Sequence, residues 1–128
     1  MLQYKRIYEA SAAEDGYRIL VDRLWPRGLA KEKANIDRWE KEIAPSADLR
    51  KKFHQEVEDF GDFQKDYLEE LDKNEVAGEF LKLVATKLEE GNVTLLFAAR
   101  DENQNNARVL ALWLGGKLSL SDEEVNHG

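Results

Sequence analysis

The sequence predicts a small α/β domain of three layers, in which a mixed, mostly parallel sheet is flanked by helices. Three observations lead to this fold class. Residues 93–99 are almost all apolar, which is typical of a strand covered on both faces. Helical spacing of apolar residues precedes and follows that strand, and two shorter strands come earlier in the chain. A length of 128 residues fits one domain.

The first predicted elements are two short strands. Residues 4–8 and 17–21 are rich in residue types that favour strands. The polar segment 11–16 between them ends in an Asp-Gly pair, which is typical of a turn. Because this segment is short for a helical crossover, we expect the two strands to pair antiparallel. One helical turn is expected over residues 29–33.

Residues 35–44 fit two different structures. Ile36, Trp39 and Ile43 recur at helical spacing, but a short strand that ends before residues 44–46 fits the same segment. The pattern leaves both structures open.

Three helices are predicted in the middle of the chain, over residues 47–53, 59–71 and 76–90. Ser46 is a suitable N-cap for the first of them, and Gly91 is a suitable stop after the third. Aromatic residues that recur every three or four positions in the second helix indicate core packing.

After the apolar strand, helical spacing resumes over residues 106–114, and the two glycines that follow are predicted to end this helix. Residues 117–120 are expected to add a last short strand. The polar residues 121–128 are expected to fray. We therefore expect one domain over residues 1–120 and a polar C-terminal tail.

The composition excludes several partners and chemistries. The chain has 26 acidic and 19 basic residues and a net charge of −7, so we expect no broad surface for nucleic acid or anionic membrane. It has no cysteine, which excludes disulfides, thiolate nucleophiles and cysteine-bound metals and fits a reducing compartment. No signal-peptide pattern and no apolar run near the roughly 20 residues of a membrane span are present. We therefore expect a cytoplasmic protein, while nothing in the sequence decides its oligomeric state.

Two polar loops follow predicted strands and mark a candidate site. Residues 22–28 (DRLWPRG) follow the strand 17–21, and residues 100–106 (RDENQNN) follow the strand 93–99. Ligands of open α/β sheets bind beyond the carboxyl ends of the strands. If the two strands are parallel neighbours, both loops open at the same edge of the sheet.

The residue types in these loops suggest how such a site works. Arg23 and Arg27 carry planar guanidinium groups that suit a carboxylate or phosphate. Asp22 and Asp101 are the candidate catalytic residues, as general bases, as groups that orient the arginines or as groups that hold a metal. Trp25 offers a face for a flat ligand. The set assigned to substrate binding is Arg23, Trp25, Arg27, Arg100, Asn105 and Asn106.

Three functions fit this set of residues. An enzyme acting on a small anionic metabolite or a nucleotide-like ligand would use one of the two aspartates as its acid–base group. A regulatory module would bind the ligand without turnover. A protein-interaction domain would use the aspartate and arginines only to close a turn, with an apolar patch elsewhere. The spacing of the aspartates matches no known metal-binding loop, and no motif identifies a cofactor. His54 follows Phe53 at the end of a predicted helix, which is typical of a surface residue.

Four segments together resemble a known family. They are residues 21–28 (VDRLWPRG), 44–53 (APSADLRKKF), 93–101 (VTLLFAARD) and 105–107 (NNA). In these segments, and over about residues 5–114, the chain resembles the YeaO-like family of bacterial proteins.

The resemblance implies a small, soluble, cytosolic α/β protein with no established reaction. Many members have a histidine where this chain has Gln104, and some longer relatives have a cysteine in the region of residues 97–101. Chemistry that depends on either residue therefore does not transfer to this chain. The arginines, aspartates and asparagines that remain suit ligand binding at least as well as catalysis.

Overall fold

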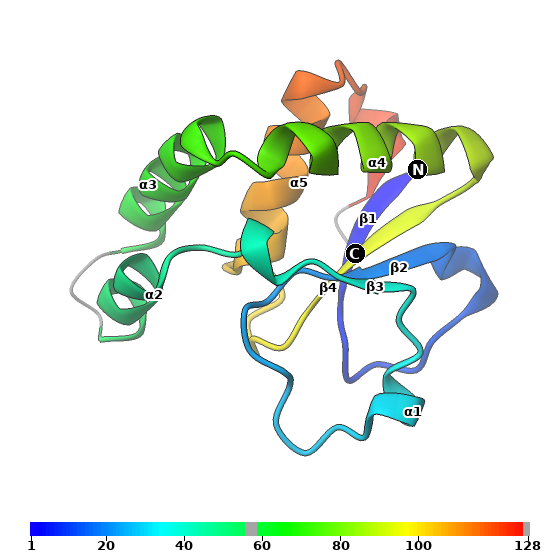
Figure 1. The fold of residues 1–128 in the computed structure, drawn as a ribbon, viewed down its shortest axis with the longest axis horizontal. Helices are drawn as coiled ribbons and strands as arrows, with labels where there is room; N and C mark the ends of the chain where they lie inside the picture. The colour runs from blue at the N-terminus through cyan, green and yellow to red at the C-terminus, as the bar shows by residue number, and fades with distance from the viewer. Residues whose placement is uncertain (56–58, 127–128) are drawn as a thin grey trace.

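The computed structural model describes residues 1–55 and 59–126, which form an α/β domain around a five-stranded sheet (Figure 1). The strand order is β3-β2-β4-β1-β5, and every pairing among the described residues is parallel. The predicted fold class is confirmed, although we find parallel strands where a mixed sheet was expected. The strands are β1 (Leu2–Arg6), β2 (Tyr17–Leu20), β3 (Arg38–Trp39), β4 (Val93–Phe97) and β5 (Val125–Asn126).

The helices are distributed unequally over the two faces of the sheet (Figure 1). Four of them cover one face, and a single turn of helix lies on the other. Among the described residues, no helix has the length and apolar character needed to cross a membrane. The helices are α1 (Lys31–Ala34), α2 (Ala47–His54), α3 (Phe60–Lys73), α4 (Ala77–Glu90) and α5 (Asn106–Lys117).

Strand β4 is the centre of the fold, and all five of its residues are buried. Val93, Leu95 and Phe97 face the main core with α2–α5, while Leu96 belongs to a smaller cluster near α1. This two-sided burial explains why the sequence of β4 is almost continuously apolar.

The expected antiparallel pairing of the first two strands is wrong. Strands β1 and β2 both pair with β4, which lies between them. The connection from Ile7 to Gly16 contains only one short 3-10 helix, Ala13–Asp15, yet it returns the chain to the opposite end of the sheet. This arrangement gives the apolar β4 a hydrogen-bonded partner on each side, which a hairpin of β1 and β2 would not do.

Residues 35–44 form the short strand β3 and then a 3-10 helix, Lys41–Ile43, so the strand alternative is the correct one for this segment. The predicted N-cap is present, since the Ser46 side chain accepts from Leu49 N–H at 3.2 Å. The Asp59 side chain caps α3, a cap that was not predicted from the sequence. The predicted Gly91 stop also ends α4.

The C-terminal region differs from the prediction. Helix α5 continues through both glycines, and no strand forms over residues 117–120. The last strand is β5, in the segment expected to fray, and it pairs with β1. Gly115 packs beside this strand, where a Cβ would be in ordinary van der Waals contact with Val125 at 3.5 Å. Residues 127–128 of the predicted tail lie outside the described residues.

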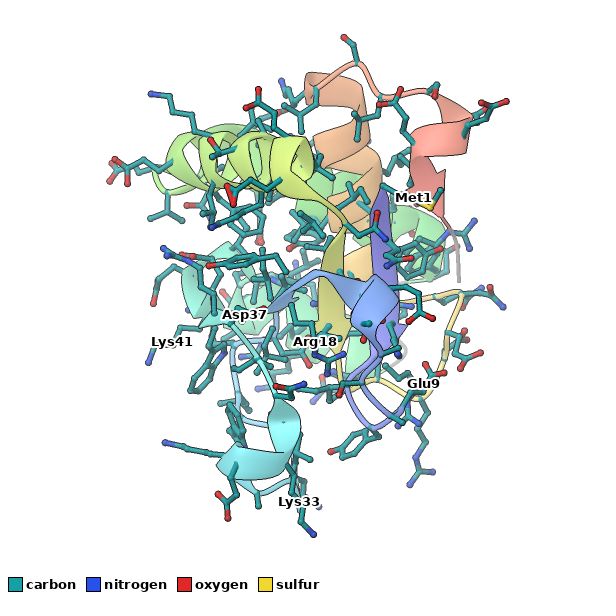
Figure 2. All side chains as sticks on the ribbon, turned by 90° about the vertical axis from the view of Figure 1, so that its right-hand side faces the viewer. Met1, Glu9, Arg18, Lys33, Asp37 and Lys41 are labelled. Atoms are coloured by element: carbon teal, nitrogen blue, oxygen red, sulfur yellow. The ribbon has the colours of Figure 1, made fainter. Side chains whose placement is uncertain are left out.

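The face of the sheet opposite the four helices holds a buried ion cluster. Arg18 on β2 is 4% exposed and pairs with Asp15, which also accepts from Lys5 Nζ at 3.1 Å. The Arg18 Nε and Nη2 atoms donate to the carbonyl oxygens of Asn35 and Ala34 at 2.7 and 3.1 Å. Figure 2 shows Arg18 on the side of the sheet that faces α1. One guanidinium group therefore connects β2, the turn before it and the end of α1.

Two opposing effects set the pKa of Asp15. Burial acts to raise the pKa, but hydrogen bonds from the Ala12 N–H, Lys5 and Arg18 together outweigh burial, so the pKa lies below its ordinary value. The carboxylate therefore stabilises the fold at neutral pH.

We expect Asp15→Asn to lower the free energy of unfolding by about 3–5 kcal/mol at pH 7, because it leaves Arg18 buried without its counter-charge. Since the pKa of Asp15 is lowered in the folded state, this stabilisation is present above the unfolded pKa of about 4 and is lost as the pH falls through the folded pKa. Urea unfolding of both proteins from pH 2.5 to 7 measures the difference. A difference that stays constant with pH contradicts the prediction.

Candidate functional site

The two polar loops meet at the carboxyl edge of the sheet, because β2 and β4 are parallel neighbours. Asp22 joins them. Its Oδ2 accepts from Ala98 N–H at 2.9 Å, and its Oδ1 accepts from Asn106 Nδ2 at 3.0 Å. The same Asn106 amide donates to the Val21 carbonyl at 3.2 Å. One carboxylate thus ties the end of β2 to the end of β4 and the start of α5.

A cavity of about 420 Å³ lies at this junction, and we call it the carboxyl-edge pocket. Seven of the eight predicted site residues line it, and Asp101 is the exception. The pocket is lined by Tyr8, Asp22, Arg23, Leu24, Trp25, Pro26, Arg27, Ala44, Pro45, Arg50, Phe53, His54, Phe63, Ala98, Ala99, Arg100, Gln104, Asn105 and Asn106.

Burial governs the ionisation of Asp22. Burial raises the pKa of this carboxyl above its ordinary value, against the hydrogen bonds from Ala98 and Asn106 and the positive charge of Arg50, which act to lower it. Both carboxylate oxygens accept hydrogen bonds from groups that hold the loops together. Asp22 therefore acts first as the structural link of the pocket.

Four arginines line the pocket: Arg23, Arg27, Arg50 and Arg100. Arg23 donates weakly to the Ala44 carbonyl at 3.4 Å and lies 3.8 Å from a carboxylate oxygen of the exposed Glu42. Its Nε and the Nε of Arg50 are buried without a hydrogen-bond partner among the described residues. The pocket therefore holds donors and positive charge that the described part of the protein does not satisfy.

Three of the predicted residues have clear structural tasks. Asp101 is exposed, and its Oδ1 accepts from the N–H groups of Asn103 and Gln104, which lower its pKa and close the loop. Asn105 is the N-cap of α5, because its Oδ1 accepts from Arg108 N–H at 2.9 Å. Trp25 donates to the Leu29 carbonyl at 2.7 Å, and its ring packs edge-on against Trp39 at 5.3 Å between centroids. These contacts fix the Trp25 ring within its loop.

Sequence reasoning missed the contribution of α2. Arg50, Phe53 and His54 from the last turns of this helix line the pocket, whereas the sequence had suggested only a surface role for His54. Their spacing places them on one side of the helix. The signal that could have found them is the family resemblance itself, since the motif over residues 44–53 contains Arg50 and Phe53.

A second cavity, of about 440 Å³, lies beside β1, but its cations already have partners. Lys5 donates to the Ala10 carbonyl and to Asp15, and Arg6 donates to the carbonyls of Ala98 and Ala99. Among the described residues, no group of three histidine, cysteine, aspartate or glutamate side chains could hold a metal ion. The carboxyl-edge pocket is therefore the candidate site.

We expect Asp22→Asn to lower the free energy of unfolding by about 1–3 kcal/mol at pH 7, since one of the two N–H donors then faces an amide NH₂ instead of an acceptor. The pKa of Asp22 is raised in the folded state, so wild-type stability from this group declines as the pH rises from about 4 through the folded pKa. The difference between wild type and variant should therefore shrink with rising pH, opposite in direction to Asp15→Asn.

The matched control is Asp101→Asn, because an asparagine Oδ1 accepts the same two loop N–H groups. It should leave the urea midpoint nearly unchanged. If Asp22→Asn and Asp101→Asn are equally mild, Asp22 is not the link between the loops.

Comparisons with known proteins place the chain in a family. The model of the inactive DUF488-N3 subclade matches residues 1–127. The uncharacterised protein YeaO of Escherichia coli K12 is 50% identical over 113 residues, which cover 88% of this chain and 96% of YeaO. The uncharacterised protein Mb3100c of Mycobacterium bovis is 38% identical over 112 residues, covering 88% of this chain and 92% of that protein. No solved structure matches. The chain belongs to the YeaO-like family of uncharacterised proteins, within the inactive DUF488-N3 subclade.

Proposed function

We propose that the protein binds a small anionic ligand in the carboxyl-edge pocket, without turnover. The observation that carries this proposal is the set of four arginines around one cavity of about 420 Å³. Among the described residues, the side chains of Arg27, Arg50 and Arg100 have neither a hydrogen-bond acceptor nor an ion-pair partner. Guanidinium groups suit phosphate and carboxylate oxygens because their planar donors match both geometries.

The charge distribution supports an anion specifically. The chain has a net charge of −7 and only eight arginines, yet half of these surround this pocket. Asp22 is the one carboxylate among the described residues that line the pocket, and both of its oxygens already accept hydrogen bonds from Ala98 and Asn106. Like charges that line one cavity repel each other. An anion would relieve the repulsion, so its binding should also stabilise the fold.

Helix α5 adds to the positive potential. Its first residue, Asn106, lines the pocket, and the Asn105 cap satisfies the Arg108 N–H. The N-terminus of a helix carries a partial positive charge and unpaired N–H groups, both of which favour an anion. The dipole is a second, smaller contribution beside the four guanidinium groups.

Two considerations support binding over catalysis. The two predicted catalytic aspartates have structural tasks, since Asp22 joins the loops and Asp101 closes a turn outside the lining. In addition, the description of the matching family calls this subclade inactive. The absence of cysteine suits the reducing cytoplasm. The acidic net charge favours a small ligand in one pocket over a broad surface for nucleic acid.

We expect inorganic pyrophosphate to raise the melting temperature of the wild-type protein and to bind in calorimetric titration. The double variant Arg27→Gln/Arg100→Gln should weaken binding by at least tenfold, because each lost charged hydrogen bond is worth about 1.5–3 kcal/mol. Both arginines are exposed and make no side-chain hydrogen bond among the described residues, so their replacement should leave the fold intact.

The control is Arg38→Gln, which removes an exposed arginine from β3 that pairs with Glu40 and does not line the pocket. It should bind pyrophosphate as wild type does. If pyrophosphate, phosphate and citrate all leave the wild-type melting temperature unchanged at millimolar concentration, the proposal is wrong.

A catalytic function is the second candidate, and the raised pKa of Asp22 in a pocket that also holds His54 favours it. Incubation with nitrophenyl phosphate separates the two functions. Binding without turnover gives no nitrophenol above the buffer rate, whereas an enzyme gives release that Asp22→Asn and His54→Gln abolish.

A further inference from the structure

We propose that the ligand is an organic anion with a flat aromatic ring, whose anionic group lies among the arginines and whose ring packs against Phe53. This inference rests on the proposed function and names the chemical class of ligand that the same pocket takes. It follows from the size of the pocket, its apolar wall and the spacing of the groups on α2.

The pocket has room for more than an inorganic anion. Its volume of about 420 Å³ lies in the range of roughly 300–1,000 Å³ that is typical of sites for small organic molecules. A lone phosphate would occupy a fraction of this space and leave the rest to water. The remaining volume can hold an organic body attached to the anionic group.

Aromatic side chains form one wall of the pocket. Phe53 and Phe63 both line it, and their rings stack at 4.7 Å between centroids with an interplanar angle of 28°. Phe63 is buried and packs on Tyr67, whereas Phe53 at the end of α2 is only partly buried. Phe53 thus extends an aromatic stack from the core to the cavity, and a flat ring is the shape that continues such a stack.

The cationic and aromatic groups are one helical turn apart. Arg50 and Phe53 are three residues apart on α2 and both line the pocket. Side chains at this spacing are neighbours, with about 5–6 Å between their Cβ atoms. An anionic group attached directly to an aromatic ring, or separated from it by a few atoms, matches this distance.

The other aromatic side chains suit this task less well. Trp25 is fixed by its hydrogen bond to the Leu29 carbonyl and by its packing against Trp39. Tyr8 is 42% exposed, and its hydroxyl donates to the Arg27 carbonyl. These contacts leave Phe53 as the residue that selects for a ring.

Phenyl phosphate and methyl phosphate test the inference, because they carry the same anionic group and differ in the ring. Calorimetric titration of the full chain should give a dissociation constant at least tenfold lower for phenyl phosphate. Phe53→Leu keeps an apolar side chain but removes the flat face, so it should reduce this ratio to below about threefold. Phe60→Leu is the matched control, since the Phe60 ring packs against the rings of Phe53 and Phe63 but does not line the pocket.

The outcomes separate the two proposals. Equal affinity of wild type for the two phosphates overturns the aromatic ligand and leaves the anion site in place. Binding of neither compound, and of no pyrophosphate, overturns both proposals. A ratio that falls equally in Phe53→Leu and Phe60→Leu overturns the role of Phe53. The wild-type ratio decides the ligand class even if Phe53→Leu does not fold.

Discussion

The carboxylate of Asp22 is the interaction on which the rest of the candidate site depends. It accepts one hydrogen bond from the end of β4 and one from the first residue of α5, while its own backbone continues from β2. Its carbonyl also accepts from the Trp39 indole at 2.7 Å, which connects β3 to the same point. The carboxylate acts together with the Asn106 amide, which also donates to the Val21 carbonyl, and with the Val21 N–H, which donates to the Leu96 carbonyl. The ends of β2 and β4 and the start of α5 thus meet at one side chain that lines the pocket.

The two faces of the sheet use buried charge in opposite ways. Asp15 and Arg18 form a satisfied pair on the face near α1, and the pKa of Asp15 is lowered because its charge is stabilised. At the carboxyl edge, the burial of Asp22 outweighs its hydrogen bonds and the charge of Arg50. The pKa of Asp22 is therefore raised, although four arginines line the same pocket. Charge that is balanced internally serves stability, whereas charge left unbalanced beside a cavity is typical of a binding site. This contrast distinguishes the two cavities of similar size.

Membership in an inactive subclade is consistent with the proposal that the pocket binds a ligand without turnover. A pocket can lose its acid–base group and still retain the guanidinium donors that recognise an anion, because recognition needs only positioned charge and hydrogen bonds. The family resemblance implies a histidine in many relatives at the position of Gln104, and Gln104 lines the pocket. Under the proposed function, the arginines around Gln104 bind the anion without a histidine.

The sequence by itself determined the α/β class, the helices over the middle of the chain, the central apolar strand and the two loops of the site, because periodicity and turn chemistry are local properties. The tertiary structure alone decided strand order. Strand β4 separates β1 from β2, a consequence of non-local pairing that no local pattern contains. It also decided that α5 continues through two glycines beside β5, and that Arg50, Phe53 and His54 join the pocket. These residues belong to a helix whose direction is set by packing against α3, so the pocket depends on contacts between distant segments.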